Sequence, residues 1–79
     1  MIKVELLEYM YSHEPTDADE IADVMQMTYS ATAMALMRLV RQDLASRYKD
    51  PDTQIYVYEL TAKGEARLNY FLEDEFDGY

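Results

Sequence analysis

Apolar residues recur every three to four positions in four stretches of the chain, which is the spacing of helices that bury one face. Two of these stretches come early, at residues 2–13 (IKVELLEYMYSH) and 17–25 (DADEIADVM). The other two occupy residues 28–43 and 62–76. The pattern therefore predicts four helices, each with an apolar side that needs covering.

A different pattern separates the last two helices. Residues 45–49 (ASRYK) and 54–60 (QIYVYEL) read as strands, the second with alternating β-branched and aromatic residues. They flank the turn DPDT, in which Pro51 fixes one backbone angle. A β-hairpin is expected, and the order helix, helix, helix, strand, strand, helix makes the fold α+β and mostly α.

Polar residues mark the expected helix ends. Pro15 ends the first helix, and Thr16 with Asp19 resembles a capping box for the second. Thr28 and Thr61 are placed to cap the third and the last. The first helix has two apolar stripes, and one is expected to face the core while the other faces a partner. One stripe is Ile2, Leu6, Tyr9 and His13, and the other is Val4, Leu7 and Tyr11. The predicted inward positions of the other three are Ile21, Ala22, Val24 and Met25; Thr32, Ala35, Leu36, Leu39 and Val40; Leu68, Phe71, Leu72 and Phe76.

Length and composition predict one small domain, residues 1–79, with an acidic tail at 73–79. The chain has no cysteine, which excludes disulfides and cysteine-bound zinc. No apolar run approaches the roughly 18 residues of a membrane span, and the start lacks the basic region of a signal peptide. We therefore expect a cytoplasmic protein that does not contact membranes.

Charge is unevenly distributed. The formal net charge is −9, which disfavours non-specific attraction to nucleic acid. Residues 28–49 reverse the sign locally, because Arg38, Arg41, Arg47 and Lys49 there face only one acidic residue. This basic segment predicts contacts with phosphates, although the same residues could instead pair with nearby carboxylates.

Catalytic chemistry finds no support in the sequence. His13 is the only histidine, and the two glycines, Gly64 and Gly78, cannot form a phosphate-binding loop. The acidic run from Asp17 to Asp23 is explained by the positive end of the second helix dipole and lacks the glycine of a calcium loop. We predict a non-enzyme without cofactor or metal.

The segment DEIADVMQMTYSATAMALMRLVRQDLASR, followed by YVYELTAKGEARL, resembles the winged helix-turn-helix domains of MarR and PadR regulators. The resemblance covers roughly residues 3–72. It implies three helices, a β-hairpin wing and a C-terminal helix, with helix 28–43 in the major groove of double-stranded DNA. It also implies a two-fold dimer on a palindromic site, for which the first and last helices offer apolar surface.

Carried over position by position, the resemblance assigns a set of DNA contacts on the third helix. The groove-facing residues of the third helix are Tyr29, Ser30, Ala33, Met34, Met37, Arg38 and Arg41. With the basic segment, the resemblance leads to the first functional hypothesis, a small repressor-like transcriptional regulator in which Arg38, Arg41, Arg47 and Lys49 contact phosphates. Two positions depart from the family pattern: the wing tip is Asp50-Pro51-Asp52, and Asp43 stands where a glycine is common.

Aromatic and sulfur side chains leave a second hypothesis open. Tyr56, Tyr58 and Tyr70 are expected to pack the hairpin on the last helix, while Tyr29 and Tyr48 are expected to be exposed contacts. An acidic winged-helix module that binds a protein through Met34 and Met37, and not DNA, is the alternative function. The alternative placement of either methionine is in the core. The acidic surplus also fits adaptation to high salt.

Overall fold

The computed structural model describes the backbone of residues 2–77 and the side chains of residues 4–72. Over these residues the chain forms a mostly helical α+β domain, as predicted. The helices are α1 (Ile2–Ser12), α2 (Ala18–Met25), α3 (Tyr29–Arg41) and α4 (Ala62–Asp77). The strands are β1 (Thr16–Asp17), β2 (Ala45–Lys49) and β3 (Tyr56–Leu60).

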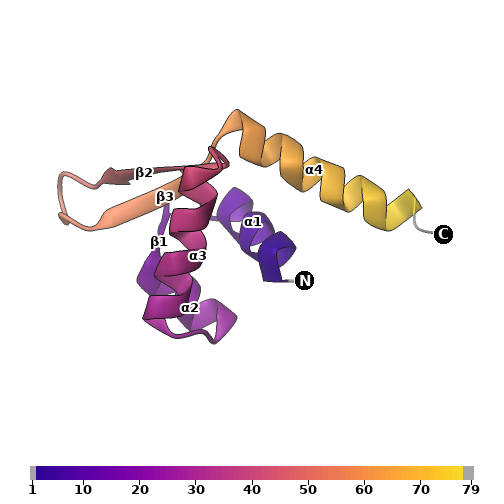
Figure 1. The fold of residues 1–79 in the computed structure, drawn as a ribbon. Coiled ribbons are helices and arrows are strands. Elements are labelled where there is room, and N and C mark those ends of the chain that lie inside the picture. The colour runs from indigo at the N-terminus through magenta and orange to yellow at the C-terminus, as the bar shows by residue number, and fades with distance from the viewer. Residues whose placement is uncertain (1, 78–79) are drawn as a thin grey trace.

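The three strands form one antiparallel sheet in the order β1-β3-β2. Ala45 pairs with Leu60 and Lys49 with Tyr56, so β2 and β3 form a long hairpin. Figure 1 shows this hairpin projecting on one side of the molecule while α4 extends on the opposite side, with α1 beneath it. Helices α2 and α3 lie below the hairpin and are joined by a short turn.

The core lies where α1 meets the other elements. Leu7 and Met10 of α1 are fully buried, together with Ile21 of α2, Leu36 of α3 and Leu44 before β2. Burial of each of these large apolar side chains stabilises the folded state by roughly 1.5–3 kcal/mol. Helix α1 therefore holds the helix-turn-helix, the sheet and α4 together.

Helices α2 and α3 both end in a left-handed residue that is not glycine. Gln26 has φ 56° and Asp43 has φ 63°. After α3, the N–H of Asp43 donates to the carbonyl oxygen of Val40 (3.0 Å) and that of Leu44 to Leu39 (2.9 Å). This pair of backbone hydrogen bonds forms a Schellman motif, which favours glycine at the left-handed position. Asp43 therefore occupies a position at which this backbone geometry favours glycine.

The start of α2 differs from the prediction. Asp17, and not Thr16, caps the helix, because its carboxylate accepts the N–H of Glu20 at 2.8 Å. Thr16 is buried one residue earlier, in strand β1, where it pairs with Tyr58. The predicted capping box with Asp19 was wrong because this short strand was missed.

Two tyrosines and one valine predicted to be inward are exposed, namely Tyr56, Tyr70 and Val24. Val24 lies to the side of the buried face of α2. In α1 the core is not met by one stripe alone, because Leu6 and Leu7 are both buried. Tyr70 points away from the inward face of α4 because it follows Leu68 by two positions. Tyr56 lies at the outer end of β3, so only Tyr58 of the three tyrosines enters the core. The side chains of Ile2 and Phe76 lie outside the described residues.

A hydrogen-bonded cluster joins α1, β1 and α2. The Tyr9 hydroxyl donates to Glu20 Oε2 at 2.6 Å, and the Thr16 hydroxyl donates to the same oxygen at 3.0 Å. The bond to Glu20 raises the pKa of Tyr9 to about 12, and the bonds from Tyr9 and Thr16 lower the pKa of Glu20. His13, just after α1, stacks its ring on Tyr9 with centroids 4.1 Å apart.

Replacing Tyr9 with Phe should lower the melting temperature in a pH-dependent way. The lowered pKa of Glu20 contributes stability above the unfolded value of 4.5, and this is lost as pH falls through the folded pKa. The raised pKa of Tyr9 contributes stability below the unfolded value of 10.0, which is lost as pH rises through about 12. The difference in melting temperature between wild type and Tyr9→Phe should thus be largest between those limits. An equal difference at pH 3 and pH 7 would contradict it.

Candidate nucleic-acid interface

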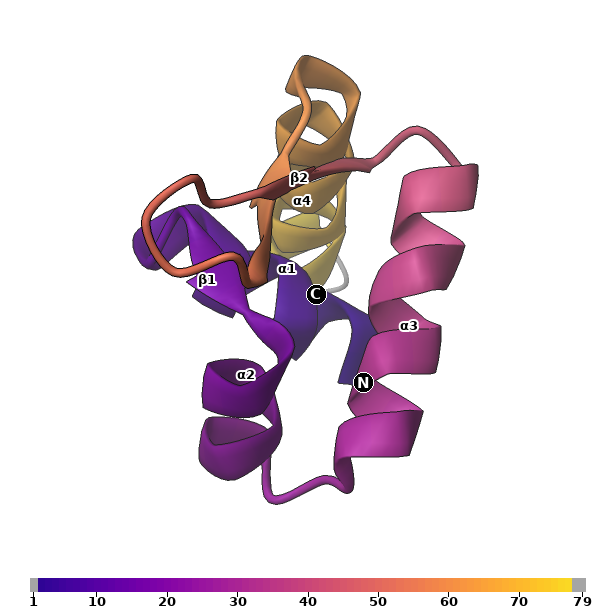
Figure 2. The same cartoon turned by 90° about the vertical axis from the view of Figure 1, so that its left-hand side faces the viewer.

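Helix α3 has one buried side and one outward side. Thr28 caps it as predicted, accepting the N–H of Ala31 at 3.1 Å. Thr32, Leu36 and Leu39 are buried against the rest of the domain, and the Thr32 hydroxyl donates to the Thr28 carbonyl oxygen at 2.9 Å. Figure 2 shows α3 standing at the edge of the molecule, with α2 and the hairpin to one side.

All seven predicted groove-facing residues are exposed or half-buried. The exposed ones are Tyr29, Ser30, Met34, Arg38 and Arg41; the half-buried ones are Ala33 and Met37. Met34 is 58% exposed, so its alternative placement in the core is wrong. Met37 is only partly covered and lies outside the buried core cluster. The outward side of α3 is thus apolar in its middle and basic toward its C-terminal end.

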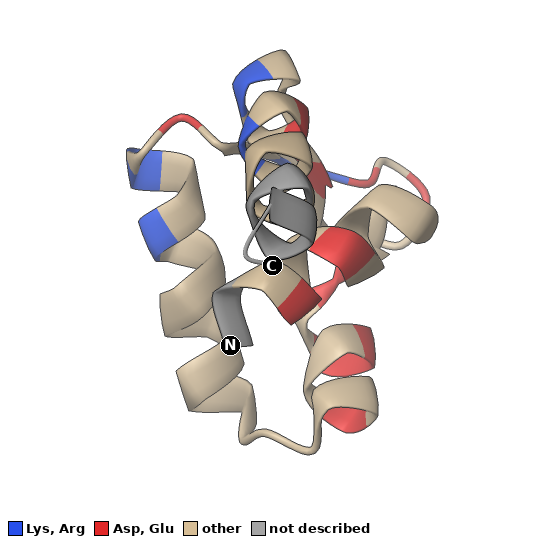
Figure 3. Ribbon diagram, turned by 90° about the vertical axis from the view of Figure 1, so that its right-hand side faces the viewer, with Lys and Arg blue, Asp and Glu red and all other residues tan. Residues whose placement is uncertain are grey.

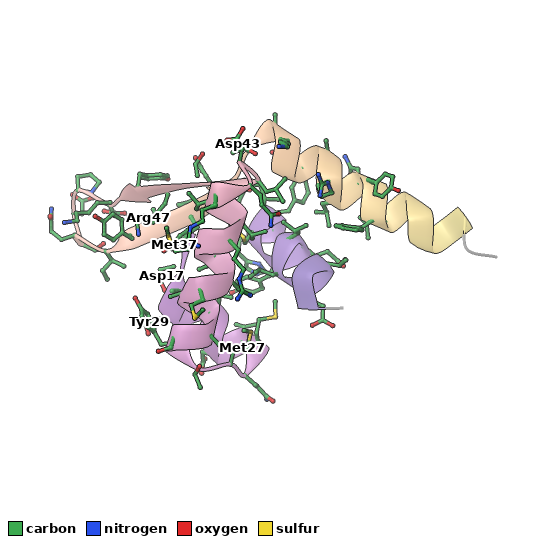
Figure 4. The ribbon with its side chains drawn as sticks, viewed as in Figure 1. Asp17, Met27, Tyr29, Met37, Asp43 and Arg47 are labelled. Carbon is green, nitrogen blue, oxygen red and sulfur yellow. The ribbon has the colours of Figure 1, made fainter. Side chains whose placement is uncertain are left out.

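Arg47 and Lys49 extend the same surface onto the hairpin. The Arg47 guanidinium lies over the Tyr56 ring, 4.1 Å from its centroid, and donates to Met37 Sδ at 3.5 Å. The Lys49 ammonium lies 5.4 Å from the same ring. Figure 4 shows Met37 and Arg47 next to each other where α3 faces the hairpin. Because cation–π contacts hold the two charges in place, β2 presents them beside α3.

Within residues 4–72, Arg38 and Arg41 do not form the ion pairs with nearby carboxylates that were the alternative prediction for the basic residues. Over the part of the chain whose side chains are described, neither has a carboxylate partner. Figure 3 shows Lys and Arg at the C-terminal end of α3 and the start of α4, whereas Asp and Glu gather on α2. Both guanidinium groups are therefore available to an external anion.

The tip of the hairpin is acidic for a local structural reason. The Asp50 carboxylate accepts the N–H groups of Asp52 (2.8 Å) and Thr53 (3.2 Å), which fixes the turn. Gln54, with φ 64°, completes it and donates its own N–H to the Asp50 carbonyl oxygen at 2.8 Å. Asp52 is exposed at the tip, so the outermost charge has the wrong sign for a phosphate.

Between α3 and the hairpin lies an open cavity of about 400 Å³. Aromatic rings of Tyr29 and Tyr56 line it, with Met37 and Arg47 on one side and Asp17 on another. Within the described residues, no group of three or more carboxylates or histidines is placed to hold a metal ion. No helix in that part of the chain is long and apolar enough to cross a membrane.

Tyr56 is the residue of this surface that the sequence did not reveal. The sequence pattern predicts that it packs the hairpin on α4, because Tyr56, Tyr58 and Leu60 alternate on one face of β3. That face continues past the edge of the core, where its partners are Arg47 and Lys49. The register between β2 and β3 places the Tyr56 ring next to these charges, and the sequence alone does not reveal this register. Tyr29 and Tyr48 are exposed, as predicted.

Two helices joined by a tight turn, the second with an exposed outer face, and a hairpin beside it define a winged helix-turn-helix domain. A family described as "Winged helix DNA-binding domain" matches residues 2–64, and the chain belongs to this family. The sequence matches no curated protein.

Solved structures agree with this family. A crystal structure of MarR is 25% identical with a TM-score of 0.87, over 96% of this chain and 52% of that one. The MepR–DNA complex of S. aureus is 28% identical with a TM-score of 0.84, over 95% of this chain and 64% of that one. YusO of Bacillus subtilis shares the fold, with a TM-score of 0.86 and 22% sequence identity. The match covers 90% of this chain and 51% of YusO. The chain thus spans about half the length of MarR and YusO. The predicted likeness to MarR regulators is confirmed.

Proposed function

We propose that the protein is a transcriptional regulator that binds double-stranded DNA with α3 in the major groove. The observation that carries the proposal is the outward face of α3, on which Arg38 and Arg41 are exposed and have no carboxylate partner among residues 4–72. The family is one of DNA-binding domains, and the related MepR was solved in complex with DNA. In this arrangement Arg38, Arg41, Arg47 and Lys49 contact phosphates, while Tyr29 and Ser30 approach the bases.

The protein acts as a homodimer in this proposal, with α1 and α4 forming the interface. Tyr70 of α4 is 63% exposed, and Phe71 and Leu72 beside it are only partly covered within one chain. A second copy on these helices would cover that apolar surface and place two α3 helices on one duplex. Sedimentation at high micromolar concentration should give a dimer, whereas a single monomeric species would contradict this assembly.

A salt titration tests DNA binding directly. Fluorescence anisotropy of a duplex from upstream of the protein's own gene should show sub-micromolar affinity, and a scrambled duplex should bind more weakly. Because four basic side chains per subunit are available, the slope of log affinity against log salt should be no steeper than about −7 for a dimer. Absence of binding at any salt concentration would refute the proposal.

Reversing the charge of the hairpin tip should strengthen DNA binding. Asp52 is exposed, and a tip lying within the Debye length of about 10 Å at 0.1 M salt repels phosphates. Asp52→Lys is expected to raise affinity by roughly threefold to tenfold and to steepen the salt slope. Glu65→Lys makes the same charge change on α4 and serves as control. If the two variants behave alike, the tip lies away from the DNA.

One observation favours a second function, a protein-interaction module that does not bind DNA. Met34 is 58% exposed in the middle of α3, and methionine suits adaptable protein contacts. Met37 lies beside it on the same face and would share that contact. The −9 net charge of the chain, carried mostly outside α3, would favour a basic protein partner. Failure of the salt titration would make capture of such a partner by immobilised protein the next experiment.

A further inference from the structure

The middle of the outward face of α3 has no side chain with an oxygen or nitrogen atom. Between Ser30 near the start and Arg38 near the end, the outward positions are Ala33, Met34 and Met37. These three residues and the two arginines line a shallow hollow of about 280 Å³. A surface of this kind offers methyl and thioether groups to whatever it meets, with charge only at one end.

The major groove offers one apolar group to such a surface, the C5-methyl group of thymine. Every base pair also presents polar atoms at this depth, so the methyl group is the feature that an apolar side chain can distinguish. A methionine and an alanine in the groove therefore favour T·A pairs by contact with the methyl group.

The geometry of α3 limits how many bases this surface can reach. Ala33 and Met37 lie about 6 Å apart along the helix axis, at 1.5 Å per residue, which corresponds to about two base-pair steps of 3.4 Å. Met37 accepts a hydrogen bond from the Arg47 guanidinium, whereas Met34 is exposed. Met34 and its neighbour Ala33 are consequently the side chains that reach the bases.

We infer that Ala33 and Met34 recognise thymine C5-methyl groups, so that each half of the binding site carries one or two T·A pairs opposite the middle of α3. The inference rests on the proposed function, because it assigns the bases read by the same helix. The arginines position the helix in this assignment, and the methyl contacts select the T·A pairs.

The test removes the methyl group without changing any hydrogen-bonding atom. Duplexes that bind the wild-type protein are first selected from a randomised pool, and each thymine is then replaced by deoxyuracil. At one or two positions per half-site, the replacement should weaken binding by about threefold to fivefold per methyl group. Replacing such a T·A pair with C·G should weaken it further, and 5-methylcytosine should restore part of the loss.

Variants connect the effect to the named residues. Met34→Ala, at an exposed position, should remove most of the difference between thymine and deoxyuracil duplexes. Ser30→Ala, on the same face, should retain that difference even if overall affinity falls. Equal binding of thymine and deoxyuracil duplexes by wild type, or an unchanged difference in Met34→Ala, would overturn the inference while DNA binding stands. Failure to select any duplex would instead refute the proposed function and this inference with it.

Discussion

Replacing Arg38 and Arg41 with alanine should weaken binding to every DNA sequence by on the order of a hundredfold or more at 0.1 M salt. Both guanidinium groups lie at the C-terminal end of α3 and have no carboxylate partner among the described residues. Four phosphate contacts would be lost per dimer, so the salt slope should become shallower by about 3.6. Anisotropy titrations at several salt concentrations measure both quantities.

Two controls separate charge from structure in this experiment. The double substitution to lysine keeps both charges and should retain the salt slope, although affinity falls moderately where a planar guanidinium is needed. Arg67→Ala removes a charge from α4 instead and should leave the slope nearly unchanged. An unaltered slope in the double alanine variant would remove both arginines from the interface.

The net charge of the chain does not decide whether it approaches DNA, because the charges are separated in space. Asp17 and Asp50 are engaged in capping and turn formation, as acceptors of backbone N–H groups. Arg47 lies over a tyrosine ring, and no carboxylate among the described side chains pairs with it. Local potential governs association more than the sum of charges. A basic face can therefore persist on an acidic domain.

The helices could be predicted from sequence because their signals are local. Thr28 and Thr61 cap α3 and α4 as expected, each accepting an N–H group three residues on. The spacing of Thr32, Leu36 and Leu39 correctly identified the buried side of α3, and hence its outward side. The face proposed to contact DNA thus follows from a pattern within one helix.

The features that were missed depend on contacts between distant segments. Strand β1 has two residues, too few for a periodic pattern, and exists because Thr16 and Asp17 pair with β3. Whether Tyr56 lies in the core or under Arg47 depends on where the core ends along β3, which the alternation does not reveal. The left-handed conformation of Gln26 was likewise hidden, since glutamine rarely adopts it.

Replacing Gly64 with alanine should destabilise the domain by about 2–3 kcal/mol, although the same change at an ordinary helix position is stabilising. A Cβ atom at Gly64 would fall on the carbonyl oxygen of Leu44, far inside contact distance, and close to the side chain of Leu60. That oxygen also accepts the N–H of Thr61 at 3.1 Å, so the backbone cannot withdraw without losing the bond.

This close approach explains why a glycine suits the segment LTAKG, residues 60–64, between β3 and α4. The first turn of α4 lies directly on the backbone that links α3 to β2, where the Thr61 hydroxyl also donates to the Asp43 carbonyl oxygen at 2.7 Å. Thermal unfolding should show Gly64→Ala melting well below wild type, by roughly 4–8 °C per kcal/mol in a domain of this size. Glu65→Ala, at the next and exposed position, should melt close to wild type. Equal melting of both variants would show that α4 does not need a glycine to contact this turn.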